Sequence, residues 1–146
     1  MPMLARYLTD DHDQCDQLFA EAENAVADGK WADAESGFGQ FRSATLRHFQ
    51  REESILFPAF EDRTGMTQGP TSVMRDEHEQ IRGVLEVMAG TLASRDSAAY
   101  LGHSETLLML LRQHNLKEEQ ILYPMVDRAM ADEAAVLLSR MQGESN

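Results

Sequence analysis

Residues 114–124 read HNLKEEQILYP, and residues 48–58, sixty-six positions earlier, read HFQREESILFP. Each copy begins with a histidine, carries a glutamate four positions later, and ends in an apolar patch followed by a proline. On a helix, two residues four positions apart lie on the same face, one turn apart. The repeat therefore predicts two helices that each present an imidazole and a carboxylate side by side.

Two further histidines follow the same repeat, because DDH at residues 10–12 corresponds to DEH at residues 76–78. Four of the five histidines in the chain thus share one offset of sixty-six positions. We interpret the repeated histidines and glutamates as the ligands of a two-metal site. The six candidate ligands are His12, His48, Glu52, His78, His114 and Glu118.

Apolar residues recur at alternating steps of three and four along four segments, which is the pattern of amphipathic helices. The first segment spans residues 4–26 and stops at Gly29, a residue type that suits a helix C-terminus. The second runs from about Trp31 to about Arg63, and Pro58 predicts a kink in its last turns. The candidate ligands in these segments lie on the apolar stripes, so they are expected to point inward.

The second half of the chain follows the same plan. The turn-forming residues 64–70 predict a loop, and Thr71 or Ser72 is expected to cap the third helix. Asp96 or Ser97 is expected to cap the fourth. The predicted inward stripe of the fourth helix is Ser104, Leu107, Leu111, His114, Glu118, Ile121 and Met125.

Positions along the chain predict that the four histidines meet. In an antiparallel helix hairpin, residues equidistant from the turn lie at the same height. The midpoint between His12 and His48 falls in the first predicted turn, and that between His78 and His114 falls in the third. At about 1.5 Å per residue, both pairs lie roughly 25–27 Å from their turns.

The sequence therefore predicts an all-α fold. Short connections make neighbouring helices antiparallel, which gives an up-down-up-down four-helix bundle. An apolar segment at about residues 132–141 predicts a short C-terminal fifth helix that acts as a lid over one bundle end. We expect a single domain over residues 1–146, with its core at about residues 4–128, because this length fits one domain.

Burial of the candidate ligands is the argument for a metal. A buried carboxylate without a partner costs several kcal/mol, and a bound cation removes that cost. One histidine and glutamate four positions apart are usually a solvated pair, but two such pairs in register with two more inward histidines favour a dinuclear site. Imidazole and carboxylate ligands without a thiolate suit iron, manganese or zinc.

The net charge, the cysteine count and the lack of long apolar segments restrict the expected binding partners and the cellular location of the protein. The formal net charge is −12, so neither a nucleic-acid backbone nor an anionic membrane is an expected partner. A single cysteine, Cys15, permits no internal disulfide and fits a reducing compartment. The N-terminus has no apolar run typical of a signal peptide, and no segment reaches membrane-spanning length. We expect a cytoplasmic protein.

The pattern of ligands resembles the hemerythrin-like (HHE cation-binding) family, from about Leu4 to about Arg128. The two Glu-Glu-x-x-Leu-Phe/Tyr-Pro tails, which begin at Glu52 and Glu118, are also similar to that family. The resemblance implies a non-haem centre of two Fe ions with an oxo or hydroxo bridge, in which these two glutamates are bridging carboxylates. Zn and Mn are the less favoured metals.

The resemblance also separates branches of the family. Oxygen carriers have a fifth ligating histidine one turn before the third-helix histidine, where this chain has Met74. The symmetric set found here looks more like the branch associated with iron–sulfur repair and with the response to nitric oxide or peroxide. Reversible oxygen carriage is therefore not expected.

Other polar residues near the predicted site were weighed as well. His103 lies about three turns from His114, too far to bind the same cluster, and is expected to be a flanking or capping histidine. Glu53 and Glu119 are expected to face outward or to contact a ligand, and Glu119 is the alternative ligand by resemblance to oxygen carriers. Tyr7 and Tyr123 are expected to be packing aromatics, with a phenol that binds metal or donates a hydrogen bond as the alternative.

Two functions remain in view. The first is a di-iron protein whose open metal positions react with or sense a small oxidant such as dioxygen, peroxide or nitric oxide, in stress response or iron–sulfur repair. The second is a non-enzymatic metal- or oxygen-binding module whose occupancy is sensed by a partner. Structural zinc is the least favoured, since a bundle of this size needs no metal to fold.

Overall fold

The computed structural model describes residues 3–143, and within that range the chain forms helices and turns without any strand. The long helices are α1 (Met3–Ala27), α2 (Trp31–Arg51), α4 (Pro70–Ala93) and α5 (Ser97–Lys117). The shorter helices are α3 (Phe57–Thr64), α6 (Tyr123–Ala129) and α7 (Ala134–Gly143). Two π-helical turns, η1 (Glu52–Leu56) and η2 (Glu118–Leu122), and a 3-10 turn, η3 (Ala131–Glu133), join them. The prediction of one domain over residues 1–146 includes residues 1–2 and 144–146, which lie outside this range.

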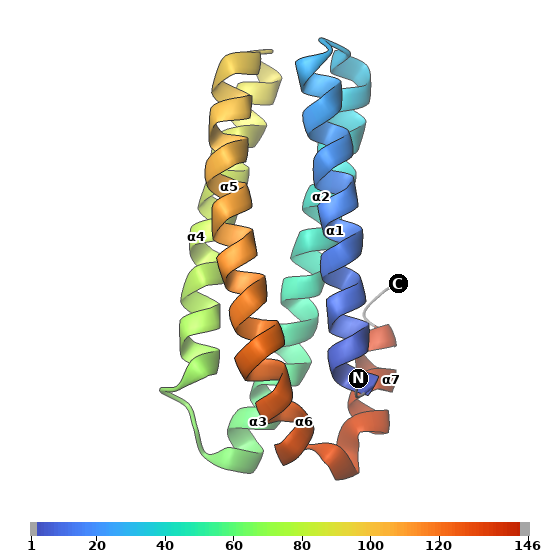
Figure 1. Cartoon of the computed structure of the whole chain (residues 1–146), viewed down its shortest axis with the longest axis vertical. Coiled ribbons are helices and arrows are strands. Elements are labelled where there is room, and N and C mark those ends of the chain that lie inside the picture. Colours follow the sequence, from blue (N-terminus) through green and yellow to red (C-terminus); the bar gives the residue numbers. More distant parts are fainter. Residues whose placement is uncertain (1–2, 144–146) are drawn as a thin grey trace.

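The long helices form an up-down-up-down bundle, which confirms the predicted fold class. α1 packs along α2, α4 packs along α5, and the two hairpins meet through α1–α5 and α2–α4 contacts (Figure 1). The α1–α2 and α4–α5 turns lie at one end of the bundle, and the loop between α3 and α4 lies at the other. Gly29 and Gly65 have φ values of 69° and 73° in two of these connections, which glycine adopts without steric cost.

The observed N-terminal cap of α5 matches the prediction from the sequence, and that of α4 does not. Asp96 caps α5 as predicted, because its side chain accepts a hydrogen bond from the Ala99 backbone N–H. The prediction that Thr71 or Ser72 caps α4 was wrong, since the cap is Gly69 and the helix begins at Pro70. Proline suits the first helical position, where its missing N–H would have no partner in any case.

The second predicted helix, from Trp31 to Arg63, is interrupted before its proline. After α2, the π-helical turn η1 bonds the Phe57 N–H to the Glu52 carbonyl, and α3 then continues through Pro58. The fourth helix repeats this, with the Tyr123 N–H bonded to the Glu118 carbonyl in η2. Each wide turn adds one residue to the helical period, so the side chains beyond it are rotated around the axis.

This rotation corrects the predicted inward stripe of the fourth helix. Ile121 is 55% exposed and Met125 is only partly buried, whereas Leu122, Tyr123 and Val126 are each 1% exposed. The prediction assumed a constant 3.6 residues per helical turn, which leaves out the residue added by the π-helical turn η2. The stripe therefore holds as far as Glu118 and fails after it.

Apolar side chains form two clusters, one on each side of the level at which the candidate ligands lie. One cluster surrounds Phe41 and Met88 toward the α1–α2 and α4–α5 turns. The other lies among η1, α3, α6 and α7, and Leu137 and Met141 of α7 complete it. The predicted lid helix is thus present, and α7 packs against α1 and η1. No helix within residues 3–143 is long and apolar enough to cross a membrane.

Candidate metal centre

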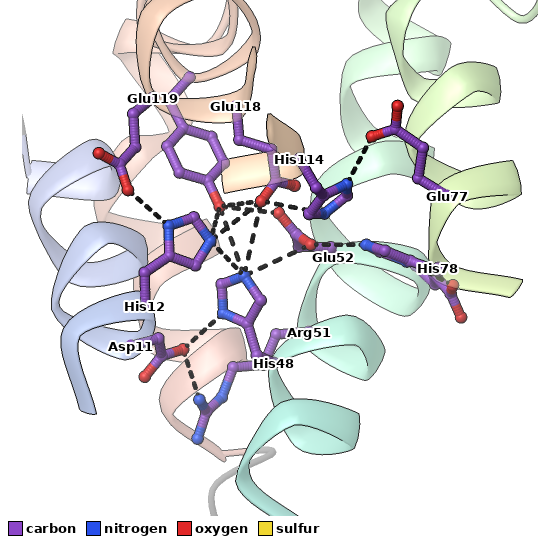
Figure 2. Close-up of polar contacts among 12 residues, drawn as sticks. Asp11, His12, His48, Arg51, Glu52, Glu77, His78, His114, Glu118 and Glu119 are labelled. Atoms are coloured by element: carbon purple, nitrogen blue, oxygen red, sulfur yellow. Dashed lines mark hydrogen bonds and ion pairs between the residues drawn. The ribbon is translucent and has the colours of Figure 1, made fainter. Parts of the chain in front are cut away.

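The structure brings all six predicted ligands together inside the bundle (Figure 2). The four histidines come from α1, α2, α4 and α5, and the two glutamates are the first residues of η1 and η2. Every one of the six is at most 4% exposed, and both glutamates are completely buried. The repeat and the equal distances from the turns therefore identified a real cluster, while the ligand roles of its members stay a prediction.

The side chains divide into two donor groups, in each of which all donor atoms lie within 4.8 Å of one another. The first group contains Glu52, His78, His114 and Glu118, and the second contains His12, His48 and Glu118. Glu118 belongs to both. Its Oε1 atom lies 3.0 Å from His12 Nε2 and 3.4 Å from His114 Nε2. This arrangement can hold two cations that share a carboxylate.

Unsatisfied polar atoms show that the cluster fits a cation. Among residues 3–143, Glu52 Oε1, His78 Nε2, His114 Nε2 and Glu118 Oε2 are buried and make no hydrogen bond. His78 Nε2 lies 3.1 Å from Glu52 Oε1, but without the orientation of a hydrogen bond. Each buried polar atom left unpaired costs about 1–3 kcal/mol. All four atoms belong to the first donor group, and a metal ion bound there would satisfy them together.

A second layer of carboxylates orients the histidines. Each histidine donates its Nδ1 hydrogen to one carboxylate, which turns Nε2 toward the centre of the cluster. The pairs are His12 with Glu119 (2.7 Å), His48 with Asp11 (3.0 Å), His78 with Glu53 (2.6 Å) and His114 with Glu77 (2.8 Å). These carboxylates also obey the repeat, since Asp11 corresponds to Glu77 and Glu53 to Glu119.

Sequence reasoning identified only part of this layer. Glu119 was expected to contact a ligand or to be one; it contacts Nδ1 of His12 and belongs to neither donor group. Glu53 was expected to face outward or to contact a ligand, and it contacts His78. Asp11 and Glu77 were missed, although their acidic positions directly before His12 and His78 recur in the repeat.

Basic residues hold three of the four outer carboxylates. Arg51 Nη1 lies 2.6 Å from Asp11, Lys117 Nζ lies 2.5 Å from Glu77, and Arg82 Nη2 lies 2.7 Å from Glu53. Arg51 and Lys117 are again one repeat apart, but the position that corresponds to Arg82 is Asp16. The carboxylate of Glu119 therefore lacks the repeat-related cation that its counterpart Glu53 has.

The electrostatics of the cluster raise the pKa values of His48, His78 and His114 when no metal is bound. Burial alone would lower the pKa of His114, but the adjacent Glu118 carboxylate outweighs it and raises that pKa to about 9. The pKa of His48 is likewise raised well above its ordinary value, because Glu52 and Asp11 outweigh burial. Burial and the nearby Glu118 raise the pKa of Glu52. A metal ion would replace protons at these nitrogens, so its binding depends on pH.

Tyr123 lies in the cluster, which corrects the expectation of an ordinary packing aromatic. Its hydroxyl donates to Glu52 Oε2 at 2.8 Å and lies 3.0 Å from Glu118 Oε1. Burial and the two glutamates raise the pKa of Tyr123 well above its ordinary range. Tyr7, in contrast, is half-buried, and its ring lies 5.6 Å from the Arg51 guanidinium.

The remaining candidates lie outside both groups. His103 is a half-buried residue of α5 and belongs to neither donor group. Met74, which takes the place of the carriers' fifth histidine, is 3% exposed and packs in the apolar cluster near α7. Cys15 is half-buried and packs against the other cluster, and burial raises the pKa of its thiol.

Comparisons with known proteins agree with this geometry. A family model described as "Hemerythrin HHE cation binding domain" matches residues 3–126. The iron-sulfur cluster repair protein YtfE of Escherichia coli O81 (strain ED1a) is 35% identical over 96 residues, which cover 59% of this chain and 42% of the relative. The protein of the same name from Escherichia fergusonii is 34% identical, with the same coverage. The match thus spans less than half the length of these curated relatives. No solved structure matches the chain at comparable significance.

Proposed function

Because the chain belongs to the hemerythrin HHE cation-binding domain family, we propose that it is a non-haem di-iron protein that reacts with or senses a small oxidant. Dioxygen, peroxide and nitric oxide are the candidate small molecules. The proposed iron ligands are His12, His48, Glu52, His78, His114 and Glu118. Iron is favoured over zinc or manganese by the resemblance to the family, and the donor atoms suit all three metals.

The observation that carries this proposal is the set of buried donor atoms without hydrogen bonds. Four polar atoms on the residues of the first group are buried and make no hydrogen bond among the described residues. Protein interiors rarely tolerate such atoms singly, and a cluster of them supports a cation site. Glu118 belongs to the second group as well, and this supports two cations held close together.

Bound iron would supply redox chemistry and a position at which a small molecule can coordinate. The residues of the chain would hold it in a fixed arrangement. Asp11 and Glu77, each paired with a basic side chain, orient the imidazoles of His48 and His114. Burial of the ligands keeps bulk water away from the donor atoms, so that only small molecules are expected to reach them.

The proposed cellular role is a response to oxidative or nitrosative stress, including iron–sulfur cluster repair. The two curated relatives named above are called iron-sulfur cluster repair proteins, and their similarity supports this role. The match covers 42% of each relative, so the repair activity of the whole relative is itself a proposal for this chain. We also propose a cytoplasmic location. With a net charge of −12, neither nucleic acid nor membrane is proposed as a partner.

The alternative is a non-enzymatic module that binds metal or oxygen and changes stability when it does so. The ligands come from all four long helices or the turns that extend them, and this supports such a role. A metal bound by all four would join the α1–α2 hairpin to the α4–α5 hairpin. Turnover of peroxide or nitric oxide by the loaded protein favours the reactive function, and stoichiometric binding alone favours the module.

The first experiment is to measure metal in protein purified without added metal and to record its optical spectrum in air. We expect about two iron ions per chain, with near-ultraviolet bands of an oxo bridge. His48→Ala should lose metal while the protein stays helical, and His103→Ala should keep it. Zinc alone, or no metal even after anaerobic reconstitution with iron, would overturn the di-iron proposal.

A further inference from the structure

We propose that Tyr123 is itself a metal ligand, and that its phenolate oxygen completes the position formed by His12, His48 and Glu118. This inference rests on the proposed function, because it concerns one of the two metal positions. It goes further in assigning a fourth donor that neither the repeat of histidines and glutamates nor the family match identifies.

The two donor groups are unequal without the tyrosine. The group with His78 and His114 has two carboxylates, whereas the group with His12 and His48 includes only Glu118. Glu52 Oε1 approaches His48 Nε2 to 3.4 Å but belongs to the first group. The hydroxyl of Tyr123 lies 3.3 Å from His12 Nε2 and 3.4 Å from His48 Nε2. With this oxygen included, each position has two imidazoles and two oxygen donors.

The distances among these four atoms fit a coordination shell. His12 Nε2 lies 3.1 Å from His48 Nε2 and 3.0 Å from Glu118 Oε1. Glu118 Oε1 lies 3.9 Å from His48 Nε2 and 3.0 Å from the Tyr123 hydroxyl. The six distances among the four atoms average about 3.3 Å, and the centre of a tetrahedron with that edge lies about 2.0 Å from each corner. Metal–nitrogen and metal–oxygen bonds have this length.

Ordinary hydrogen bonding does not require this arrangement. A phenol has one hydrogen, which can serve one acceptor at a time, yet four polar atoms lie within 3.4 Å of the Tyr123 oxygen. Packing does not require the hydroxyl either, because the repeat places Phe57 at the corresponding position. The ring of Phe57 is fully buried and stacks 5.8 Å from the imidazole of His78. The hydroxyl group is thus one feature by which one half of the site differs from the other.

Binding would exchange a proton for a metal ion. The phenol O–H bond breaks, the proton leaves to solvent, and the oxygen forms a bond to the metal without any change in oxidation state. The two metal positions would then have equal numbers of donors of different kinds. We therefore expect two inequivalent metal ions in the loaded protein.

The test is a spectrum of ferric protein, prepared by anaerobic loading with Fe²⁺ and then exposure to air. A ferric phenolate absorbs visible light by charge transfer, and resonance Raman spectroscopy excited in that band reports tyrosinate ring vibrations. We expect both signals in the wild-type protein and their loss in Tyr123→Phe. The matched control is Tyr7→Phe, which removes the hydroxyl of the tyrosine whose ring packs against Arg51 and should retain both signals.

Two further measurements keep the outcome clear. Titration with Zn²⁺ should produce the ultraviolet difference spectrum of a tyrosinate in wild-type protein but not in Tyr123→Phe. In the double variant Phe57→Tyr/Tyr123→Phe, the new tyrosine at position 57 should give a phenolate signal from the metal position formed by His78 and His114. Circular dichroism checks that each variant folds, and phenylalanine already occupies the equivalent position in the repeat.

The outcomes distinguish this inference from the proposed function. Two metal ions per chain without any phenolate signal, or with a signal that survives in Tyr123→Phe, would overturn the ligand assignment and leave the di-iron proposal standing. Failure of the wild-type protein to bind either Fe²⁺ or Zn²⁺ would overturn both.

Discussion

The substitution Glu118→Gln should weaken metal binding at both positions, because this one carboxylate belongs to both donor groups. Its Oε1 atom lies close to His12 on one side and to His114 on the other. Glutamine preserves the shape of the side chain but replaces the charged carboxylate by a neutral amide with one acceptor oxygen. His78→Ala, in contrast, removes a donor from one group only.

The size of the effect follows from the linkage between binding and folding. A metal that binds only the folded chain stabilises it by about 2.7 kcal/mol per site at a free concentration of 100 times Kd. Two such sites contribute about 5.4 kcal/mol, which raises Tm by roughly 11–22 °C for a chain of this length. If Glu118→Gln raises both Kd values about a hundredfold, only about 0.4 kcal/mol per site remains. His78→Ala should retain about half of the wild-type increase.

The assay is thermal unfolding followed by circular dichroism, with and without anaerobic Fe²⁺, together with measurement of bound metal. His103→Ala is the matched control, since it changes a histidine outside both groups and should keep the full increase in Tm. The reasoning is refuted if Glu118→Gln binds as much iron as the wild-type protein and shows the same increase. It is also refuted if Glu118→Gln loses no more of the increase than His78→Ala.

Three other predictions concern the layers around the site. Leu122→Ala should destabilise the protein by about 2–5 kcal/mol and Ile121→Ala by less than about 0.5 kcal/mol in urea unfolding, because the π-helical turn buries the first and exposes the second. Glu77→Gln should weaken metal affinity by about 10–100-fold in a competitive chelator titration without loss of helix, and unchanged affinity would contradict its role in orienting His114. Burial and Glu23 raise the pKa of Tyr100 to about 12. The stabilisation from its neutral phenol is therefore complete below about pH 10 and lost by about 2.7 kcal/mol as pH rises through 12, a fall that Tyr100→Phe should lack when unfolding is measured across this range.

The internal repeat extends well beyond the ligands. It includes all four carboxylates that contact the histidines, since Asp11 corresponds to Glu77 and Glu53 to Glu119. It also includes the basic residues Arg51 and Lys117. It breaks at several places, and two examples near His12 are Asp16, which corresponds to Arg82, and Tyr123, which corresponds to Phe57. Both departures lie in the half of the site formed by His12 and His48. They make the two donor groups of this nearly two-fold bundle chemically different.

The sequence alone was enough to predict the bundle and the cluster of six candidate ligands. A spacing of four residues places His48 and Glu52 on one helical face whatever the neighbouring helices do. Equal distance from a turn sets the height of His12 opposite His48 in any antiparallel hairpin. Both arguments depend only on local helix geometry and on short connections, which the sequence specifies directly.

Tertiary structure alone decided how the side chains beyond this cluster are directed. The π-helical turn at η2 rotates the following helix, so that Tyr123 faces the cluster and Ile121 faces solvent. The pairing of Asp11 with His48 likewise crosses from α1 to α2 and depends on the rotation of each helix about its axis. Hydrophobic periodicity averages over several turns and does not register one inserted residue. The hydroxyl of Tyr123 reaches the two histidines and two glutamates because packing stabilises that local departure from the α-helix.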